Sequence, residues 1–210
     1  MFPLYDLNHA RRPALVVKGL VLLNALAFLW ELAAGPEAVV AAYGFVPALF
    51  FQDPLGEGYR LLSSMFLHGG LFHILSNMWF LWVFGDNVED RMGHGRFLLF
   101  YLLGGVAAAV AQGLSAPGSQ VPMIGASGAV SAVLGAYYAL FPRAYVVSLV
   151  FFVFPFFVTF PAGFYLGYWA FLQLLQGLLG LPGVAWWAHL GGFLFGVLLA
   201  RRFAPRWRRW

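Results

Sequence analysis

The strongest constraint on this chain is a series of long, almost uncharged apolar stretches. About 20 apolar residues are needed to cross a bilayer whose hydrocarbon core is ~30 Å thick. Hydrophobic residues make up 62% of the 210 residues, charged residues make up only 10%, and the mean hydropathy is +0.80. These values are far from those of soluble domains. The sequence therefore predicts an all-α, polytopic membrane protein with six transmembrane helices, at residues 14–34, 71–88, 97–111, 127–141, 162–179 and 185–200.

The positive charges predict how this bundle lies in the membrane. Basic residues cluster near both ends of the chain: Arg11, Arg12, Lys18, Arg201, Arg202, Arg206, Arg208 and Arg209. Because cytoplasmic segments are enriched in Lys and Arg, both termini are expected in the cytoplasm, which requires an even number of spans. Residues 145–160 are equally apolar, but they are β-branched, aromatic and interrupted by Pro155 and followed by Pro161. They are therefore interpreted as an interfacial segment rather than as a seventh span. The pI of 9.6 indicates contact with the lipid surface of a cell membrane and not with nucleic acid.

The chain is expected to form a single membrane domain over residues 1–210, since it contains no internal repeat and no low-complexity tract. The N-terminus lacks the pattern of a cleaved signal peptide, so the first apolar stretch is expected to be retained. The first outer loop, residues 35–70, is expected to be semi-buried. The absence of Cys excludes disulfides and thiolate chemistry and leaves Ser, Thr, Lys or a carboxylate as nucleophile. No cofactor and no metal are expected.

Four polar side chains within the predicted spans fall in one layer. Ser127 and His189 lie about 24 and 18 Å above the basic residues at the inner ends of their spans, counted at 1.5 Å per residue. Asn77 and His73 lie about 18 and 24 Å above Glu89 by the same count. Hydrogen-bonding groups inside a membrane are costly unless they face a cavity or each other. The sequence therefore predicts a functional site in this layer, below the outer surface of the membrane.

Ser127 opens a predicted helix in the segment IGASGAVSAVLGA. The N–H groups in the first turn of a helix lack partners and favour an anion, so an oxyanion could be held there. Gly125 and Gly128 would allow a tight turn and the close approach of a substrate backbone. Small residues recur every fourth position in two spans: Ser127, Ser131, Gly135 and Ala139 in one, and Ala188, Gly192, Gly196 and Ala200 in the other. Close packing of these faces would bring His189 toward Ser127, as a Ser–His pair requires.

Each of these residues, taken alone, is also compatible with a purely structural role. A stripe of small residues usually serves helix packing, and His73 and Asn77, which share a helix face, could form an interhelical hydrogen bond instead of donating to an oxyanion. A membrane metalloprotease is disfavoured because the chain has no HExxH motif or equivalent ligand set. An intramembrane aspartyl protease is disfavoured because Asp86 has no carboxylate partner in another span. With no acid at the depth of His189, a Ser–His dyad is favoured over a triad.

Three segments together resemble the rhomboid family: HGGLFHILSN at 68–77, GASG at 125–128 and AHLGG at 188–192. The resemblance covers residues 59–200. The resemblance implies that Ser127 is the nucleophile and His189 the general base. It also implies that His73 and Asn77 are donors in the oxyanion hole. Members of the family often carry an aromatic residue one turn after the nucleophile, packed on the histidine. This chain has Ser131 there, so the resemblance does not explain how the histidine ring is oriented.

The resemblance implies a serine endopeptidase that cleaves the transmembrane segments of single-span membrane proteins near the outer membrane face. Because the carbonyl groups of a helix are hydrogen-bonded, a substrate must unwind locally, which favours small or helix-breaking residues at the cleavage site. Residues 151–160 and the fifth span could form a lateral gate. Two alternatives stay open. One is a catalytically silent relative that binds or remodels membrane helices, and the other is a small channel or transporter lined by the same polar groups.

Overall fold

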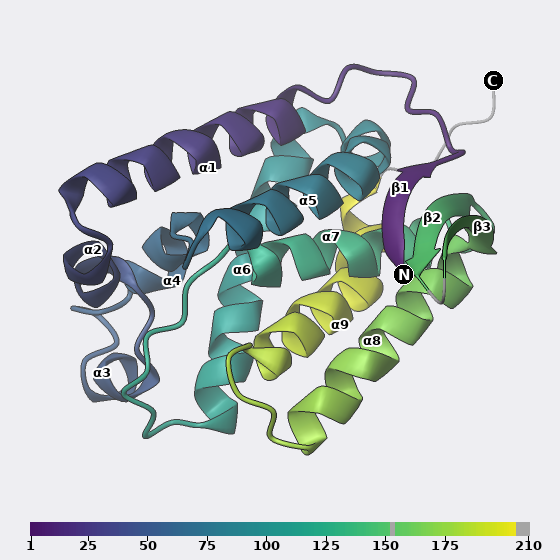
Figure 1. The fold of residues 1–210 in the computed structure, drawn as a ribbon. Helices are drawn as coiled ribbons and strands as arrows, with labels where there is room; N and C mark the ends of the chain where they lie inside the picture. Colours follow the sequence, from purple (N-terminus) through teal and green to yellow (C-terminus); the bar gives the residue numbers. More distant parts are fainter. Residues whose placement is uncertain (152–153, 205–210) are drawn as a thin grey trace.

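The computed structural model describes residues 1–151 and 154–204, which form a helical bundle with a small sheet at one end (Figure 1). A helix occupies each of the six predicted ranges: α1 (Leu15–Ala34), α5 (Leu71–Met92), α6 (His94–Ser115), α7 (Ser127–Leu140), α8 (Ala162–Leu178) and α9 (Trp186–Phe203). The six helices are thus confirmed. Among the described residues, α1 and α6 are long and apolar enough to cross a membrane by length and composition. That all six cross it stays a prediction, and the basic residues at 206, 208 and 209 lie outside the described part of the chain.

The loop between α1 and α5 is folded, as predicted. It contains α2 (Pro36–Tyr43), α3 (Pro47–Gln52), α4 (Arg60–Ser63) and the 3₁₀-helix η1 (Ser64–Phe66). Proline opens α2 and α3, where its missing N–H would have no helical partner. Arg60 is buried and donates from one guanidinium nitrogen to the carbonyl oxygens of Ala41 and Gly44, at 2.8 and 3.0 Å. A backbone bridge between Phe45 and Met123 then ties this loop to the segment that leads into α7.

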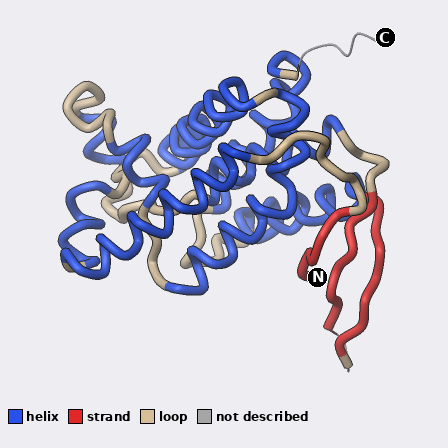
Figure 2. The backbone as a smooth tube through the Cα atoms, turned by 90° about the horizontal axis from the view of Figure 1, so that it is seen from above, coloured by secondary structure: helices blue, strands red, loops and turns tan. Residues whose placement is uncertain are grey.

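A three-stranded antiparallel sheet corrects the all-α prediction. Its strands are β1 (Phe2–Asp6), β2 (Tyr145–Phe151) and β3 (Pro155–Pro161), in the order β1-β2-β3. The segment interpreted as interfacial is therefore a β-hairpin, because β-branched and aromatic residues favour strands, and its prolines stand at the ends of β3. Figure 2 shows the three strands extending from one end of the bundle. The predicted gate at residues 151–160 includes residues 152–153, which lie outside the described residues.

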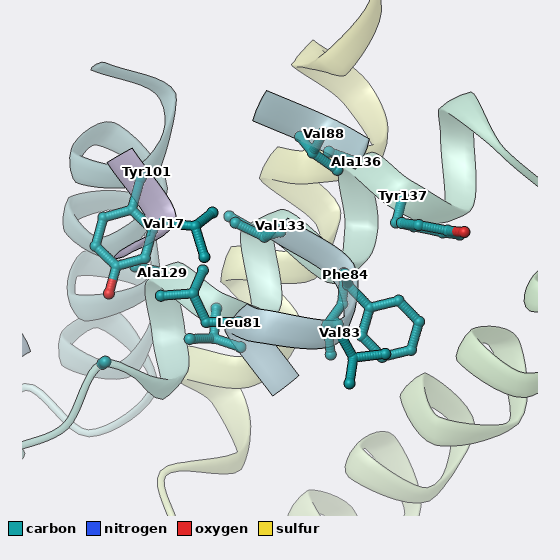
Figure 3. Packing of buried hydrophobic residues seen from close by; sticks show 14 of the residues in the cluster. Val17, Leu81, Val83, Phe84, Val88, Tyr101, Ala129, Val133, Ala136 and Tyr137 are labelled. Atoms are coloured by element: carbon teal, nitrogen blue, oxygen red, sulfur yellow. The ribbon is translucent and has the colours of Figure 1, made fainter. Parts of the chain in front are cut away.

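Helix α7 lies at the centre of the bundle, between α5 and α9 (Figure 1). Every residue from Gly128 to Tyr137 is buried, as expected for a helix that is apolar on all sides. Figure 3 shows how side chains of neighbouring helices gather around it: Val17 of α1 and Leu81 of α5 lie beside Ala129 and Val133. The central helix is therefore fixed in rotation and depth by packing, and so is the serine that begins it.

Helices α7 and α9 pack through small residues. A methyl group added to Gly192 would collide with the carbonyl oxygen of Gly128, and one added to Gly196 would collide with the carbonyl oxygen of Ala132. Since residues four apart on α7 face residues four apart on α9, the helices run parallel, and α9 begins more than one turn before the level at which α7 begins. The predicted close packing is confirmed, and α9 uses the predicted stripe. Helix α7 uses the predicted stripe only in part: Gly135 contacts the carbonyl oxygen of Phe193 on α9 as predicted, but the other contacts are made by Gly128, Ala132 and Ala136, each one residue after a position of the predicted stripe.

Candidate active site

Ser127 is the first residue of α7 and follows a sharp turn. Gly125 adopts φ +119°, a conformation that side chains strongly disfavour, and its N–H donates to the carbonyl oxygen of Ser64 at 2.9 Å. The N–H of Ser127 stands in the first helical turn, where no preceding helical carbonyl can accept it. The hydroxyl of Ser131 donates to the carbonyl oxygen of Ser127 at 2.6 Å, so it is engaged within its own helix. The local sequence thus presents Ser127 at a helix start with an available N–H.

His73 and Asn77 from α5 lie against this turn. A Cβ atom built on Gly125 would lie 2.7 Å from Nε2 of His73 and 3.7 Å from Nδ2 of Asn77, so only glycine fits between them and the backbone. The N–H of Gly69 donates to Nδ1 of His73 at 3.2 Å, which places the ring proton of neutral His73 on Nε2. Nδ2 of Asn77 is buried and has no hydrogen-bond partner within the described part of the chain. Two neutral donors therefore lie beside the backbone that leads into Ser127.

His189 lies in the first turns of α9, at the same end of the α7–α9 contact as Ser127. Its Nδ1 is 2.7 Å from Oε1 of Gln173 on α8. The ring centroid of Trp169 is 6.1 Å away with planes tilted by 31°, and that of Trp186 is 6.2 Å away at 90°. Among the described residues, no hydrogen bond joins His189 to Ser127. In enzymes free of substrate such catalytic hydrogen bonds are often long and shorten when substrate binds.

A small cavity connects the elements of the site. It has a volume of about 10 Å³ and is lined by residues that include Gly125, Ser127, Gly128 and Ala188. This volume is close to the smallest that holds one water molecule. Gly128 lines the cavity, but a Cβ on it would lie 2.6 Å from Cβ of Ala108, so its lack of a side chain serves helix packing. The structure therefore brings together the turn at Gly125, the start of α7 and the start of α9.

His68 shapes the electrostatics next to the donors. It precedes α5, is 2% exposed, and its ring centroid lies 5.1 Å from that of His73. Burial, and to a smaller extent the neighbouring His73, lower the pKa of His68 to about 4. The ring is therefore neutral at physiological pH. Its backbone N–H donates to Oε2 of Glu31 at 2.9 Å, so this carboxylate is directed at the loop rather than at His189.

Two glutamines of the site were not predicted from the sequence. Oε1 of Gln173 contacts His189, and Oε1 of Gln112 on α6 accepts the N–H of Ala188 at 3.2 Å, which satisfies a donor at the start of α9. The signal that would have found them is the one that indicated His73 and Asn77, since an amide inside an apolar helix is costly unless it has a partner.

Comparison with known proteins assigns the family. A family model described as Rhomboid domain matches residues 55–206. The presenilin-associated rhomboid-like mitochondrial protein of Homo sapiens is 32% identical over 185 residues, which is 86% of this chain and 46% of that protein. RHOMBOID-like protein 4 of Arabidopsis thaliana is 34% identical over 150 residues, covering 68% of this chain and 33% of the relative. Rhomboid protease GluP of Bacillus subtilis (strain 168) is 43% identical over 81 residues, which is 39% of this chain and 15% of that protein.

The chain thus spans about half the length of the mitochondrial relatives it matches, and a smaller share of the other two. The match to the family model nevertheless includes the whole candidate site, from the loop before α5 to the end of α9. The family model matches most of this chain, and the human relative is similar to it over 86% of this chain's length. The chain therefore belongs to the rhomboid family of membrane proteins.

Proposed function

We propose that this protein is an intramembrane serine endopeptidase in which Ser127 and His189 form a catalytic dyad. The observation that carries the proposal is the group of donors at the start of α7 that have no hydrogen-bond partner among residues 1–151 and 154–204. The N–H of Ser127 and the side-chain donors of His73 and Asn77 border one turn of backbone, and two of these donors are neutral side chains. Such a set is suited to stabilise an oxyanion.

The chemistry follows from these positions. The hydroxyl oxygen of Ser127 attacks the carbonyl carbon of the scissile peptide bond while Nε2 of His189 takes its proton. The negative charge that forms on the carbonyl oxygen is stabilised by donation from the Ser127 N–H, His73 Nε2 and Asn77 Nδ2. His189 then gives the proton to the leaving amine as the C–N bond breaks, which leaves an ester on Ser127. Water, deprotonated by the same ring, hydrolyses the ester and restores the hydroxyl.

The substrates proposed for this site are transmembrane segments of single-span membrane proteins. Ser127 begins a helix in the middle of a bundle, so a peptide must reach it in an extended form. Small or helix-breaking residues at the cleavage site make local unwinding easier and should be preferred.

We also propose that all six long helices cross the membrane with both termini in the cytoplasm. This orientation places the sheet and the basic residues near both ends of the chain on the inner side, and the starts of α7 and α9 toward the outer side. Reporter fusions at either terminus should be cytoplasmic, whereas reporters inserted near Asp53 and Pro117 should face outward. An outward C-terminus would contradict the six-span arrangement.

The proposed activity is tested with purified protein in detergent and a single-span membrane substrate. The unmutated chain should cleave the substrate, and a mechanism-based serine hydrolase probe should label Ser127. Ser127→Ala and His189→Ala should each abolish cleavage, and the double variant should be no worse than either, because nucleophile and base act as a unit. Ser131→Ala, one turn further along the same helix, is the matched control and should keep probe labelling.

Two outcomes would reject this function. Undiminished cleavage by Ser127→Ala would rule out the assigned nucleophile. Tight binding of the substrate without turnover by the unmutated chain would favour a catalytically silent relative that binds membrane helices.

A further inference from the structure

Gln173 is a buried amide in an apolar helix. It lies on α8, is 8% exposed, and shares that helix with one other glutamine, Gln176. Burying an amide without a hydrogen bond is unfavourable, so a buried glutamine indicates a partner. The partner of Gln173 is His189, since Oε1 lies 2.7 Å from Nδ1 of the ring.

The chemistry of the two atoms fixes the proton between them. A carbonyl oxygen only accepts hydrogen bonds, so a bond between Oε1 and Nδ1 requires the proton on Nδ1. Neutral imidazole carries one ring proton, and Nε2 is then left with its lone pair. This is the tautomer that a general base needs when Nε2 takes the proton of the nucleophile. The opposite orientation of the amide would donate to Nδ1 and would leave Nε2 protonated and unable to act as base.

The amide also suits the charged state of the ring. When His189 has taken a proton, both ring nitrogens are donors, and an amide NH₂ facing Nδ1 would then repel the ring. Oε1 instead accepts a hydrogen bond from Nδ1–H both when the ring is neutral and when it is protonated. No rearrangement of the Gln173 amide is needed as the ring gains and loses its second proton.

The remaining freedom of the ring is limited from the same side of the bundle. Trp169 lies one turn before Gln173 on α8, and its ring is tilted by 31° to that of His189. On α7, the residue one turn after the proposed nucleophile is Ser131, whose hydroxyl is bonded to the backbone of its own helix. Besides Trp186 of α9, the ring contact and the hydrogen bond that hold the imidazole thus come from α8, through Trp169 and Gln173.

We propose that Gln173 is the positioning residue for His189, holding it in the Nδ1-protonated tautomer with Nε2 available to Ser127. This inference rests on the proposed function for its effect on catalysis, but the tautomer itself can be measured without any activity. Both readouts are needed, because a purely structural role for Gln173 would change stability without selecting a tautomer or lowering kcat.

The kinetic test uses Gln173→Met, which is close to glutamine in volume and lacks the acceptor. We expect kcat to fall by about 10- to 1,000-fold with KM changed by less than about threefold, since loss of the acceptor acts on the base and not on substrate binding. Gln173→Glu, which keeps an acceptor oxygen, should recover most of kcat. Its activity should extend less far toward acidic pH, because a carboxylate stabilises the protonated ring. Gln176→Met, the same change one turn away, is the control and should retain kcat.

The direct test is ¹⁵N NMR of the histidine rings in the Ser127→Ala protein, with His189 assigned by comparison with His189→Asn. The ring should be protonated on Nδ1 in this background, and adding Gln173→Met should shift the population toward the Nε2-protonated form. If Gln173→Met does not fold, Gln173→Asn, which withdraws the amide by one methylene, is measured in its place.

The outcomes separate this inference from the proposed function. Unchanged kcat and an unchanged tautomer in the Gln173 variants would overturn the positioning role while leaving the protease intact. An unmutated chain that cleaves no substrate but shows an Nδ1-protonated His189 that depends on Gln173 would overturn the proposed protease while supporting the positioning contact.

Discussion

The surroundings of the starts of α7 and α9 and those of the ends of α5 and α7 use different kinds of polar group. Around the starts of α7 and α9, the side chains that make or offer hydrogen bonds are neutral: His73, Asn77, Gln112 and Gln173. Around the ends of α5 and α7, the acceptors are carboxylates. Glu89 is 1% exposed and accepts the N–H groups of Val16 and Val17 at 2.9 and 2.8 Å, and its Oε1 lies 2.5 Å from Nδ1 of His94.

The N-terminal strand is held at this second, charged end. Asp6 accepts hydrogen bonds from the hydroxyl of Tyr137 and from Nδ2 of Asn87, and Asp90 accepts the N–H of Arg11 at 3.0 Å. A carboxylate at the start of α1 compensates unpaired N–H groups and the helix dipole. We propose a division of roles: carboxylates around the ends of α5 and α7 join segments far apart in the sequence, whereas His73 and Asn77 near the start of α7 serve the proposed chemistry. Substitutions at the two ends should therefore have different signatures.

The largest expected effect comes from the contact between α7 and α9, which runs from one end of the bundle toward the other. A methyl group on Gly196 would meet only backbone atoms, the carbonyl oxygen of Ala132 among them, so Gly196→Ala should separate α7 from α9. We expect a loss of about 3 kcal/mol or more in the free energy of unfolding, measured by denaturant titration in detergent, with loss of activity. Gly19→Ala on α1, where an added methyl group meets no atom within 4 Å, is the control and should be neutral or slightly stabilising. Normal stability of Gly196→Ala would contradict the close packing of α7 on α9.

The next effect is specific to the neutral end. His73→Ala and Asn77→Ala should each lower kcat by about 10- to 1,000-fold with a much smaller change in KM, because an oxyanion exists only in the transition state. Thermal stability should be nearly unchanged for Asn77→Ala, whose side-chain nitrogen makes no bond that would be lost. Asn24→Ala on α1, which removes a buried amide bonded to Leu20, should instead lower stability and leave kcat unaffected. If the two asparagines gave the same signature, the division of roles would be wrong.

A smaller effect is expected at the charged end. Glu89→Gln keeps the shape of the side chain but replaces one accepting oxygen by a donor that faces a backbone N–H. The free energy of unfolding should fall by about 1–3 kcal/mol, while kcat of the folded fraction stays at the parent value. Glu37→Gln on α2 removes an exposed carboxylate and should change stability by less than about 0.5 kcal/mol. A selective loss of kcat in Glu89→Gln would show that the two ends are coupled.

The sequence predicted the positions of the helices better than it predicted which segments pair or pack with one another. Six apolar stretches indicated six helices because hydropathy is a local property. The sheet was missed because β1, at residues 2–6, pairs with residues 146–149, and no local pattern shows which distant strand will supply the hydrogen bonds. The face that α7 presents to α9 was predicted only in part for a related reason: Gly135 was predicted, but Gly128 and Ala132 were not, since several stripes of small residues run along α7 and only packing against its neighbours selects among them.

The candidate site shows the same limit. Ser127, His189, His73 and Asn77 were predicted from polar residues at similar depth, and the structure places the serine, the two donors and the histidine around the starts of α7 and α9. Gln173 is likewise a polar residue in an apolar helix, but its contact with His189 depends on the packing of α8 against α9, which sequence periodicity does not reveal.

The smallest expected effect is a pH dependence at the charged end, where Asp6 holds β1. Burial raises the pKa of Asp6 from 3.8 to about 6, against the opposing hydrogen bond from Tyr137. Because the native state holds this proton between about pH 4 and pH 6 and the unfolded chain does not, the contribution of Asp6 to stability falls as pH rises through this range and is constant above it. The unfolding temperature of Asp6→Asn, measured from pH 4 to pH 8, should therefore rise relative to the parent between pH 4 and 6. Tyr137→Phe removes the opposing hydrogen bond and should move the upper limit of this range to higher pH. Parallel pH profiles for the parent and Asp6→Asn would show that the pKa of this carboxyl group does not change on folding. The contacts of the charged end that affect stability would then be those of Glu89 and Asp90.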